Sequence, residues 1–589
     1  MSESEQQEAT LPLNKRRRAF GAVESHYPLR DLAGWFRTLL GAERRYFWLA
    51  VIYGVAISGL TLAVPLAVQM LIDSIANTAL VRPLIVLSLL LFGMLAISGV
   101  LSALRTYLME LYGRRVHARL MADFSLRAVY AQAPFFENRK RDVLFHRYFD
   151  IMTLQRNVPE LLIGAFAIFL QSIMGFLVVS FYHPVFLGFN LVLIVFIYLV
   201  WRIWGPAAIR TGIDLSDAKY EAAAWLDHLG SANSLYKSRT HIQYALSRSE
   251  TLTARYIDQE KRHFRQTFAQ TIALLFLYAL ASSLLLGLGG WLVIRGELSL
   301  GQLVAAELIM SAIFVGMSQF DSYLRRFYYV SMAVAEISEL HEIPLESTEG
   351  ETLPADGSFE LRFRDVRQTT RSREAHFHFT IPEGEVVRVS AEEEVLQRMV
   401  TSMLERNEAP EHGYITIGEV DIATCDIHGL RQYLMVERRP MIMDGSIADY
   451  LVLSGADRAS RGEMFEMLQL VGIDEVVREL DEGLDTILSP IGLPLSAEEV
   501  LRLKLATALL ACPRILVVGE VFGLVDRSVW EKVLAYAAEH SEMTVLLFSS
   551  DETLPYVNRV LRLGWRDQVL VPPLESADGG ADDAGGTRA

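Results

Sequence analysis

The stretch that decides the fold is LLIGAFAIFLQSIMGFLVVSFYHPVFLGFNLVLIVFIYLVW, residues 161–201. It contains no Asp, Glu, Lys or Arg over 41 positions. A helix needs roughly 20 apolar residues to cross ~30 Å of hydrocarbon, so this stretch is long enough for two spans. His183-Pro184, near its centre, favours a tight connection between them. The sequence therefore predicts a helical hairpin in a membrane.

Four further apolar runs accompany this hairpin, at 46–72, 83–104, 266–294 and 298–320. Each is long enough to cross a bilayer as a helix, and Glu307 alone interrupts the last one. Together they predict six spans, at about 46–74, 83–110, 155–182, 185–205, 266–294 and 298–322.

Composition divides the chain of 589 residues into two unlike halves. It is 51% hydrophobic with a mean hydropathy of +0.26, which excludes a disordered protein. Residues 1–340 hold 32 Lys or Arg and 25 Asp or Glu, whereas residues 341–589 hold 23 and 45. We therefore expect a membrane domain at 26–340, an acidic soluble domain at 341–573, and disordered tails at 1–25 and 574–589.

The acidic second half argues against nucleic acid as a partner. Its two cysteines, Cys425 and Cys512, match no metal or redox spacing, which excludes a disulfide framework.

Basic residues predict the orientation, because Lys and Arg are retained on the cytoplasmic side. Segments 105–160 and 202–265 contain ten each, whereas the opposite loops contain only Arg82 and Arg295. We therefore expect an integral membrane protein with both termini in the cytoplasm. The two basic segments are long enough to carry helices beyond the bilayer, and long basic loops occur in many transporters and channels.

Over about residues 30–565 the chain resembles a type I ABC exporter half-transporter. The family's first intracellular coupling helix is matched by Ala133-Pro134-Phe135-Phe136-Glu137 and by Asp150, and its second intracellular loop by Leu229-Gly230 and Lys237. Residues 296–305 resemble the entry into the sixth span. The resemblance implies six transmembrane helices joined to an α/β ABC domain of the P-loop type, located in a bacterial inner membrane.

The phosphate loop of this family reads G-x-x-G-x-G-K-S/T, and the matching segment here departs from it. The segment runs Ala391-Glu392-Glu393-Glu394-Val395-Leu396-Gln397-Arg398-Met399, in a register fixed by Gly413. Gln397 takes the lysine position and Arg398 the hydroxyl position. Like charges ~4 Å apart repel by about 4 kcal/mol at an effective dielectric constant of 20, so three glutamates disfavour a triphosphate.

The other nucleotide positions depart in the same register. Thr370 stands where an aromatic would stack on adenine, Arg438 replaces the metal-sensing glutamine, and Gly519 replaces the metal-binding aspartate. Ser550 replaces the switch histidine, and the signature reads Leu495-Ser496-Ala497-Glu498-Glu499. Glu520 keeps the general-base position, but a base without metal, phosphate or lysine has nothing to act upon. We expect neither ATP nor Mg²⁺ as a cofactor, and no hydrolysis by this chain alone.

The resemblance also limits how a pair could work, because ATP in this family lies between the phosphate loop of one domain and the signature of the other. Both are altered here, so neither composite site of a simple pair is intact. The leading hypothesis is a membrane subunit of an ABC-exporter-type transport system. A non-transporting scaffold or regulator of a complex with an intact ABC ATPase, and an ATP-independent channel, remain as alternatives. The expected partners are the bilayer and a second ABC half-transporter, as a homodimer or a heteromer.

Polar residues in the sixth predicted span are candidates for a substrate pathway. Glu307 lies in an apolar run, where a charged group costs ~2.5–3.5 kcal/mol on insertion scales. It is therefore expected to face protein or water, either as a pathway residue or as a structural partner. Gln302 and Gln319 share this span and are further candidates.

Overall fold

The computed structural model describes residues 34–38, 41–77, 81–135, 142–354, 356–370, 373–453, 459–540 and 542–572. Contacts divide the chain into a helical unit, which ends at Leu345, and an α/β unit, which runs from Glu346 onward. This boundary lies close to the predicted one at 340. The predicted tails at 1–25 and 574–589 lie outside the described residues.

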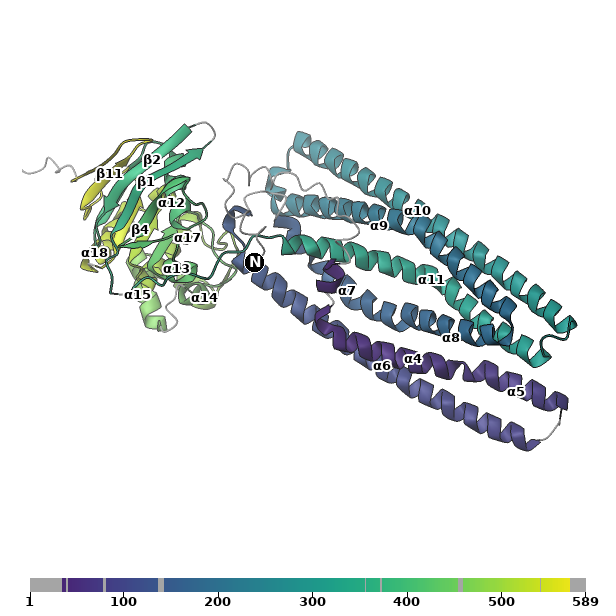
Figure 1. Cartoon of the computed structure of the whole chain (residues 1–589). Helices are drawn as coiled ribbons and strands as arrows, with labels where there is room; N and C mark the ends of the chain where they lie inside the picture. The colour runs from purple at the N-terminus through teal and green to yellow at the C-terminus, as the bar shows by residue number, and fades with distance from the viewer. Residues whose placement is uncertain are drawn as a thin grey trace, which may run out of the picture. The chain divides into compact units, whose positions relative to one another are not determined.

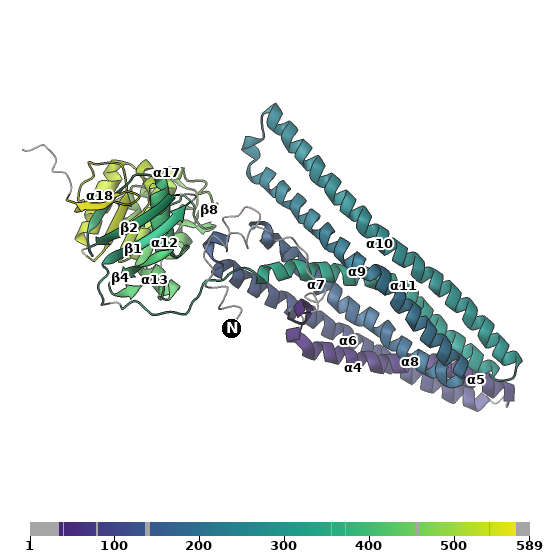
Figure 2. The same cartoon turned by 45° about the horizontal axis from the view of Figure 1, so that its top comes forward.

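The helical unit consists of long helices (Figures 1 and 2). They are α4 (Arg44–Thr61), α5 (Ala63–Asn77), α6 (Val81–Tyr130), α7 (Tyr148–Glu160), α8 (Phe166–Tyr182), α9 (Pro184–Ser231), α10 (Arg239–Ile294) and α11 (Leu300–His341). Helices α9 and α10 run side by side in both views (Figures 1 and 2). A π-helical turn, Leu161–Ala165, joins α7 to α8.

The length and apolarity of these helices suit a membrane. Five described helical segments are long and apolar enough to cross one: Arg44–Ile72, Leu84–Tyr130, Leu144–Tyr182, Pro184–Ser231 and Arg239–Ile294. The sixth predicted span falls in α11, whose described apolar part is Leu300–Ile313. Helix α10 has 56 residues, or roughly 84 Å at 1.5 Å per residue, so it is far longer than the hydrocarbon layer.

Two helix breaks follow from proline. The chain turns at His183, which is extended at φ −158° and ψ 141°, and α9 begins at Pro184, where a missing N–H costs nothing. This confirms the predicted hairpin. The first apolar run breaks between α4 and α5, a feature that hydropathy alone does not indicate. Pro65 cannot donate a hydrogen bond to the carbonyl of Thr61, which weakens the helix at this point.

The α/β unit contains two main sheets. An antiparallel sheet has the order β2-β1-β4-β5, and a six-stranded sheet has the order β12-β11-β3-β10-β9-β6. The strands are β1 (Leu361–Thr370), β2 (Arg373–Ile381), β3 (Val386–Ala391), β4 (His412–Ile417), β5 (Val420–Asp421), β6 (Leu434–Glu437), β7 (Gly445–Ser446), β8 (Ile487–Leu488), β9 (Ile515–Val518), β10 (Thr544–Phe548), β11 (Arg559–Leu563) and β12 (Gln568–Val571). Strands β11, β3, β10, β9 and β6 pair in parallel, so their carboxyl ends share one edge.

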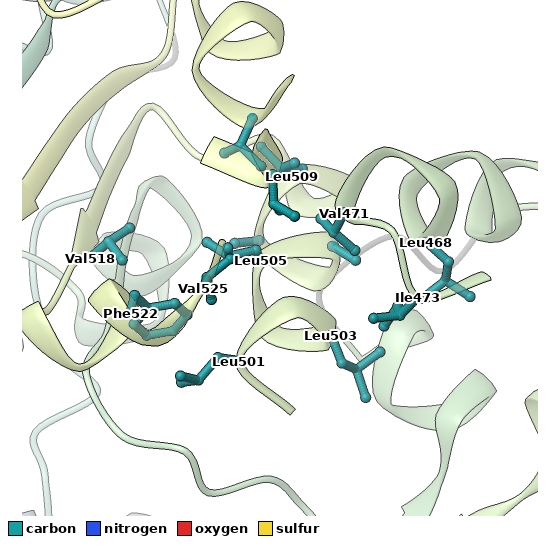
Figure 3. Close-up of a cluster of buried hydrophobic side chains, with 14 of the residues drawn as sticks. Leu468, Val471, Ile473, Leu501, Leu503, Leu505, Leu509, Val518, Phe522 and Val525 are labelled. Carbon is teal, nitrogen blue, oxygen red and sulfur yellow. The ribbon is translucent and has the colours of Figure 1, made fainter. Parts of the chain in front are cut away.

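The described part of the α/β unit also contains seven helices. The helices are α12 (Glu394–Leu404), α13 (Ile427–Tyr433), α14 (Ile447–Val452), α15 (Arg461–Val471), α16 (Asp474–Glu479), α17 (Ala497–Ala511) and α18 (Arg527–Glu539). Along β9, Leu516 and Val518 join one buried cluster and Ile515 and Val517 another, because alternate side chains point to opposite faces. Figure 3 shows part of the first cluster, where Leu468 of α15, Leu505 of α17 and Phe522 are buried.

Candidate functional site

The carboxyl edge of the parallel strands brings together three of the residues singled out in the sequence. Gly519 follows β9, Arg438 follows β6, and Gln397 lies on α12. A Cβ atom at Gly519 would lie 2.8 Å from Gln397 Nε2 and 3.2 Å from Arg438 Cα. The backbone N–H of Gly519 donates to the carbonyl of Glu437 at 2.7 Å. These positions therefore form one tightly packed group.

The connection between β3 and α12 is short. Strand β3 ends at Ala391 and α12 begins at Glu394, so only Glu392 and Glu393 lie between them. Helix α12 buries Leu396, Met399, Val400 and Met403, a spacing of three and four residues that places one apolar face on the core. Because the helix begins early, Gln397 and Arg398 lie within it.

Glu393 is held by the protein itself. Its Oε1 accepts hydrogen bonds from Arg373 Nη1 at 2.8 Å and from Trp565 Nε1 at 2.9 Å. The guanidinium of Arg373 also lies 4.1 Å from the centre of the Trp565 ring. A cavity of about 620 Å³ beside them is lined by both signs of charge: Arg373, Glu374, Glu392 and residues 564–567. Trp565 lies 172 residues from Glu393, so no local pattern indicates this contact.

The predicted signature serine begins a helix. Ser496 is the N-cap of α17, where Glu499 N donates to Ser496 Oγ at 3.3 Å and Ser496 N donates to Glu499 Oε2 at 2.7 Å. Glu498 is paired with Arg502 at 2.5 Å, and Arg502 also reaches Asp526 at 3.0 Å. The first turn of α17 thus carries two carboxylates, those of Glu498 and Glu499, and Glu499 accepts a hydrogen bond from the backbone N–H of Ser496.

Among the described residues, the remaining predicted positions make no side-chain contact of this kind with the group, although Glu520 directly follows Gly519. Glu520 is exposed at the start of a 3₁₀ turn, Ser550 is exposed two residues after β10, and half-buried Thr370 ends β1. Thr370 pairs with Arg373 across the β1–β2 hairpin. Within the described part of the chain, no hydrogen bond links these three residues to Gln397, Arg438 or Gly519.

Two acidic groups behind the edge were not indicated by the sequence. Glu437 is buried and pairs with Lys504 at 2.6 Å, and Glu405 pairs with Arg438 at 2.7 Å. Burial raises the pKa of both carboxyls above the ordinary value, although each paired cation opposes that effect.

In the helical unit, the three pathway candidates have different surroundings. Glu307 is half-buried, and its Oε2 has no hydrogen-bond partner among the described residues. Gln302 caps α11, because its Oε1 accepts from Ser299 N at 2.9 Å. Gln319 is exposed. Of the three, Glu307 alone presents a buried, unpaired polar atom.

A cavity of about 180 Å³ lies at the break between α4 and α5. It is lined by Thr61, Leu62, Val64, Pro65, Gln171, Leu308, Ile309, Ala312 and Ile313. Leu308 follows Glu307 directly in the sequence. Thr61 and Gln171 are the lining residues with polar side chains, and neither was predicted as a pathway residue. Gln171 could have been recognised as a candidate, because it is the one glutamine in the uncharged stretch 161–201.

The coupling-loop candidates are partly buried. Phe135 is buried in the 3₁₀ turn Ala133–Phe135, and Phe136 lies outside the described residues. Asp150 is 5% exposed and accepts a hydrogen bond from Tyr220 at 2.5 Å. Lys237 is exposed between α9 and α10.

Long apolar helices accompanied by an α/β unit in the same chain indicate an integral membrane protein. Residues 47–317 match the family of the ABC transporter transmembrane region. The chain is similar to the alpha-hemolysin translocation ATP-binding protein HlyB of Escherichia coli O157:H7, with 23% identity over 506 residues, 84% of this chain and 70% of that protein. The Toxin RTX-III translocation ATP-binding protein of Actinobacillus pleuropneumoniae is 23% identical over 501 residues, with the same coverage.

Among solved structures, a bacterial Atm1-family ABC exporter with ATP bound matches the fold. Its TM-score is 0.76 at 18% identity, over 89% of this chain and 95% of that chain. The family match over residues 47–317, the similarity to HlyB and the shared fold together support a half-transporter of the type I ABC exporter family. Exporters of this family typically work as dimers.

Proposed function

We propose that this chain is the membrane subunit of an ABC-exporter-type transport system whose own ABC domain has lost nucleotide chemistry. The observation that carries the proposal is the β3–α12 connection, where Glu392 and Glu393 replace a phosphate loop. In this account the domain binds neither ATP nor Mg²⁺ and hydrolyses nothing.

The residues at this connection do not fit a triphosphate with its metal. Phosphate is bound by backbone N–H groups at a helix N-terminus, with glycines that allow a close approach. Here Glu394 lies in the first turn of α12, directly after two more glutamates. Gly519 offers no carboxylate, and Arg398 offers no hydroxyl to a metal ion. Charge and ligand chemistry therefore both oppose MgATP.

The signature helix supports the same conclusion. The positive end of a helix dipole attracts anions, and a capping box satisfies it internally. Glu499 accepts from Ser496 N, and Glu498 lies beside it in the first turn of α17. A phosphate of a partner's nucleotide would meet two carboxylates at this helix end.

The relatives are named for toxin translocation and for ATP binding. In our proposal this chain shares the export function of these relatives but does not bind ATP. A complete ABC protein in the same complex then supplies the energy for transport. The chain lies in a bacterial inner membrane with both termini in the cytoplasm, and it pairs with a second half-transporter. The cavity at the α4–α5 break, with Thr61 and Gln171 in its wall, supports a pathway through this subunit.

Two alternatives make different predictions. A scaffold or regulator would associate with an intact ABC ATPase, but substitutions in the cavity wall would leave transport by the complex unchanged. A channel would conduct without any ATPase partner. Transport by the complex is therefore measured with Thr61→Val and Gln171→Leu, which alter the cavity wall. Thr251→Val, at an exposed position of α10, is the control.

The direct test is purification of the tagged full chain from its native membrane. We expect an intact ABC ATPase to co-purify, and ATP hydrolysis by the isolated chain to stay at background. Hydrolysis by the isolated chain that Glu520→Gln abolishes would refute the proposal, because it would show that the altered site is catalytic.

A further inference from the structure

Three carboxylates of the helical unit meet beyond the predicted spans. Asp217 comes from α9, and Glu336 and Glu339 come from the last turns of α11. One oxygen from each carboxylate lies within 4.8 Å of the others. Oxygen ligands on opposite sides of a Mg²⁺, Mn²⁺ or Ca²⁺ ion are roughly 4 to 5 Å apart, since each metal–oxygen distance is about 2.0–2.6 Å. The group therefore has dimensions suited to one such ion.

Arg147 holds two of these carboxylates in place. Its Nε lies 2.5 Å from Glu336 Oε2 and its Nη2 lies 2.6 Å from Glu339 Oε2. The same guanidinium therefore fixes the positions of two of the three carboxylates. The neighbouring Asp150 has other partners: it accepts a hydrogen bond from Tyr220 and lies 3.7 Å from Lys219.

Glu336 supplies a second, independent observation at this group. Its side chain is 2% exposed, and its Oε1 has no hydrogen-bond partner among the described residues. The other oxygen of the same carboxylate accepts from Arg147 Nε, and the same guanidinium also pairs with Glu339. A buried carboxylate oxygen without a partner is costly and rare in folded proteins.

We propose that Asp217, Glu336 and Glu339 bind one divalent metal cation of the Mg²⁺, Mn²⁺ or Ca²⁺ class. All ligands are oxygens, which these hard cations prefer. A cation bound here gives the buried Glu336 Oε1 a partner. The cation joins α9 to the end of α11, so its binding stabilises the packing of these two helices. The site is independent of nucleotide.

The test uses the full chain in detergent, freed of metal with EDTA and titrated with Mn²⁺ alone. Electron paramagnetic resonance of free Mn²⁺ measures binding directly. We expect saturable binding of one Mn²⁺ per chain, displaced by excess Mg²⁺ or Ca²⁺. Asp217→Asn removes one ligand but keeps both bonds of Arg147, and we expect it to weaken Mn²⁺ binding at least tenfold. Asp258→Asn, on the exposed surface of α10, is the matched control and leaves binding unchanged.

Thermal unfolding of each variant in EDTA separates ligand loss from misfolding. Asp217→Asn is expected to unfold near the wild-type temperature without metal, and to lose the stabilisation that Mn²⁺ gives the wild type. Absence of saturable binding by the wild-type chain would overturn the proposal. Binding that neither Asp217→Asn nor Glu336→Gln weakens would also overturn it, because the metal would then bind elsewhere.

Discussion

Gln397 and Gly519 are in close contact: a Cβ atom at position 519 would lie 2.8 Å from Gln397 Nε2. These are the positions that our proposal matches to the family's phosphate-binding lysine and metal-binding aspartate, and they pack against each other. Restoring one of them alone must disturb the other.

Gly519→Asp is therefore expected to destabilise the protein without restoring hydrolysis. The new side chain meets Gln397 and the backbone of Arg438, and overpacking of this kind costs about 1–3 kcal/mol. Thermal unfolding and phosphate release of the full chain are the measurements. Gly523→Asp is the control, because a Cβ at Gly523 meets nothing within 4 Å. A gain of ATPase activity in Gly519→Asp would contradict this account.

Lys504→Met should destabilise the α/β unit strongly. It leaves the buried carboxylate of Glu437 without its cation, and breaking such a pair costs about 3–5 kcal/mol. The double variant Glu437→Leu with Lys504→Met should recover much of the loss, since no charge then remains buried. Denaturant unfolding of the full chain measures both, with Lys532→Met on the exposed face of α18 as control. Equal stability of Lys504→Met and wild type would show that the pair contributes nothing.

Glu339 should make stability fall as pH rises. Burial raises the pKa of Glu339 from the ordinary 4.5 to about 7. The nearby carboxylates of Glu336 and Asp217 add to this effect, whereas Arg147 opposes it. The folded state therefore holds a proton that the unfolded state releases, so the free energy of unfolding decreases from about pH 4.5 through pH 7. The whole effect is at most about 3 kcal/mol.

Glu339→Gln tests this pH dependence in EDTA. The variant cannot titrate, so its melting temperature should fall less between pH 5 and pH 7.5 than that of the wild type. Glu250→Gln, exposed on α10, should follow the wild type. An unchanged pH slope in Glu339→Gln would show that another group is responsible.

Much of the fold could be predicted because its signals are local. Apolar runs predict the positions of long helices, and His183-Pro184 predicts the break between α8 and α9. The break between α4 and α5 was missed because a proline inside an apolar run does not by itself set where a helix ends.

The site could be predicted only in part. Sequence register indicated that Gln397, Arg438 and Gly519 belong together, because matching positions in a shared fold lie together. It could not indicate that Glu393 is bound by Trp565, or that Arg147 bridges Glu336 and Glu339, since these partners are far apart in the chain. Nor could it indicate that α12 begins at Glu394, which depends on how Leu396 and Met399 pack on the sheet.

The central claim is that this ABC domain does not bind MgATP, and equilibrium binding of MgATP to the purified full chain tests it most directly. Isothermal titration calorimetry should show no saturable binding at millimolar MgATP, and Gln397→Ala and Arg398→Ala should behave like the wild type. Saturable micromolar binding that either substitution abolishes would contradict the account, because it would show that the glutamate-rich connection still holds a nucleotide.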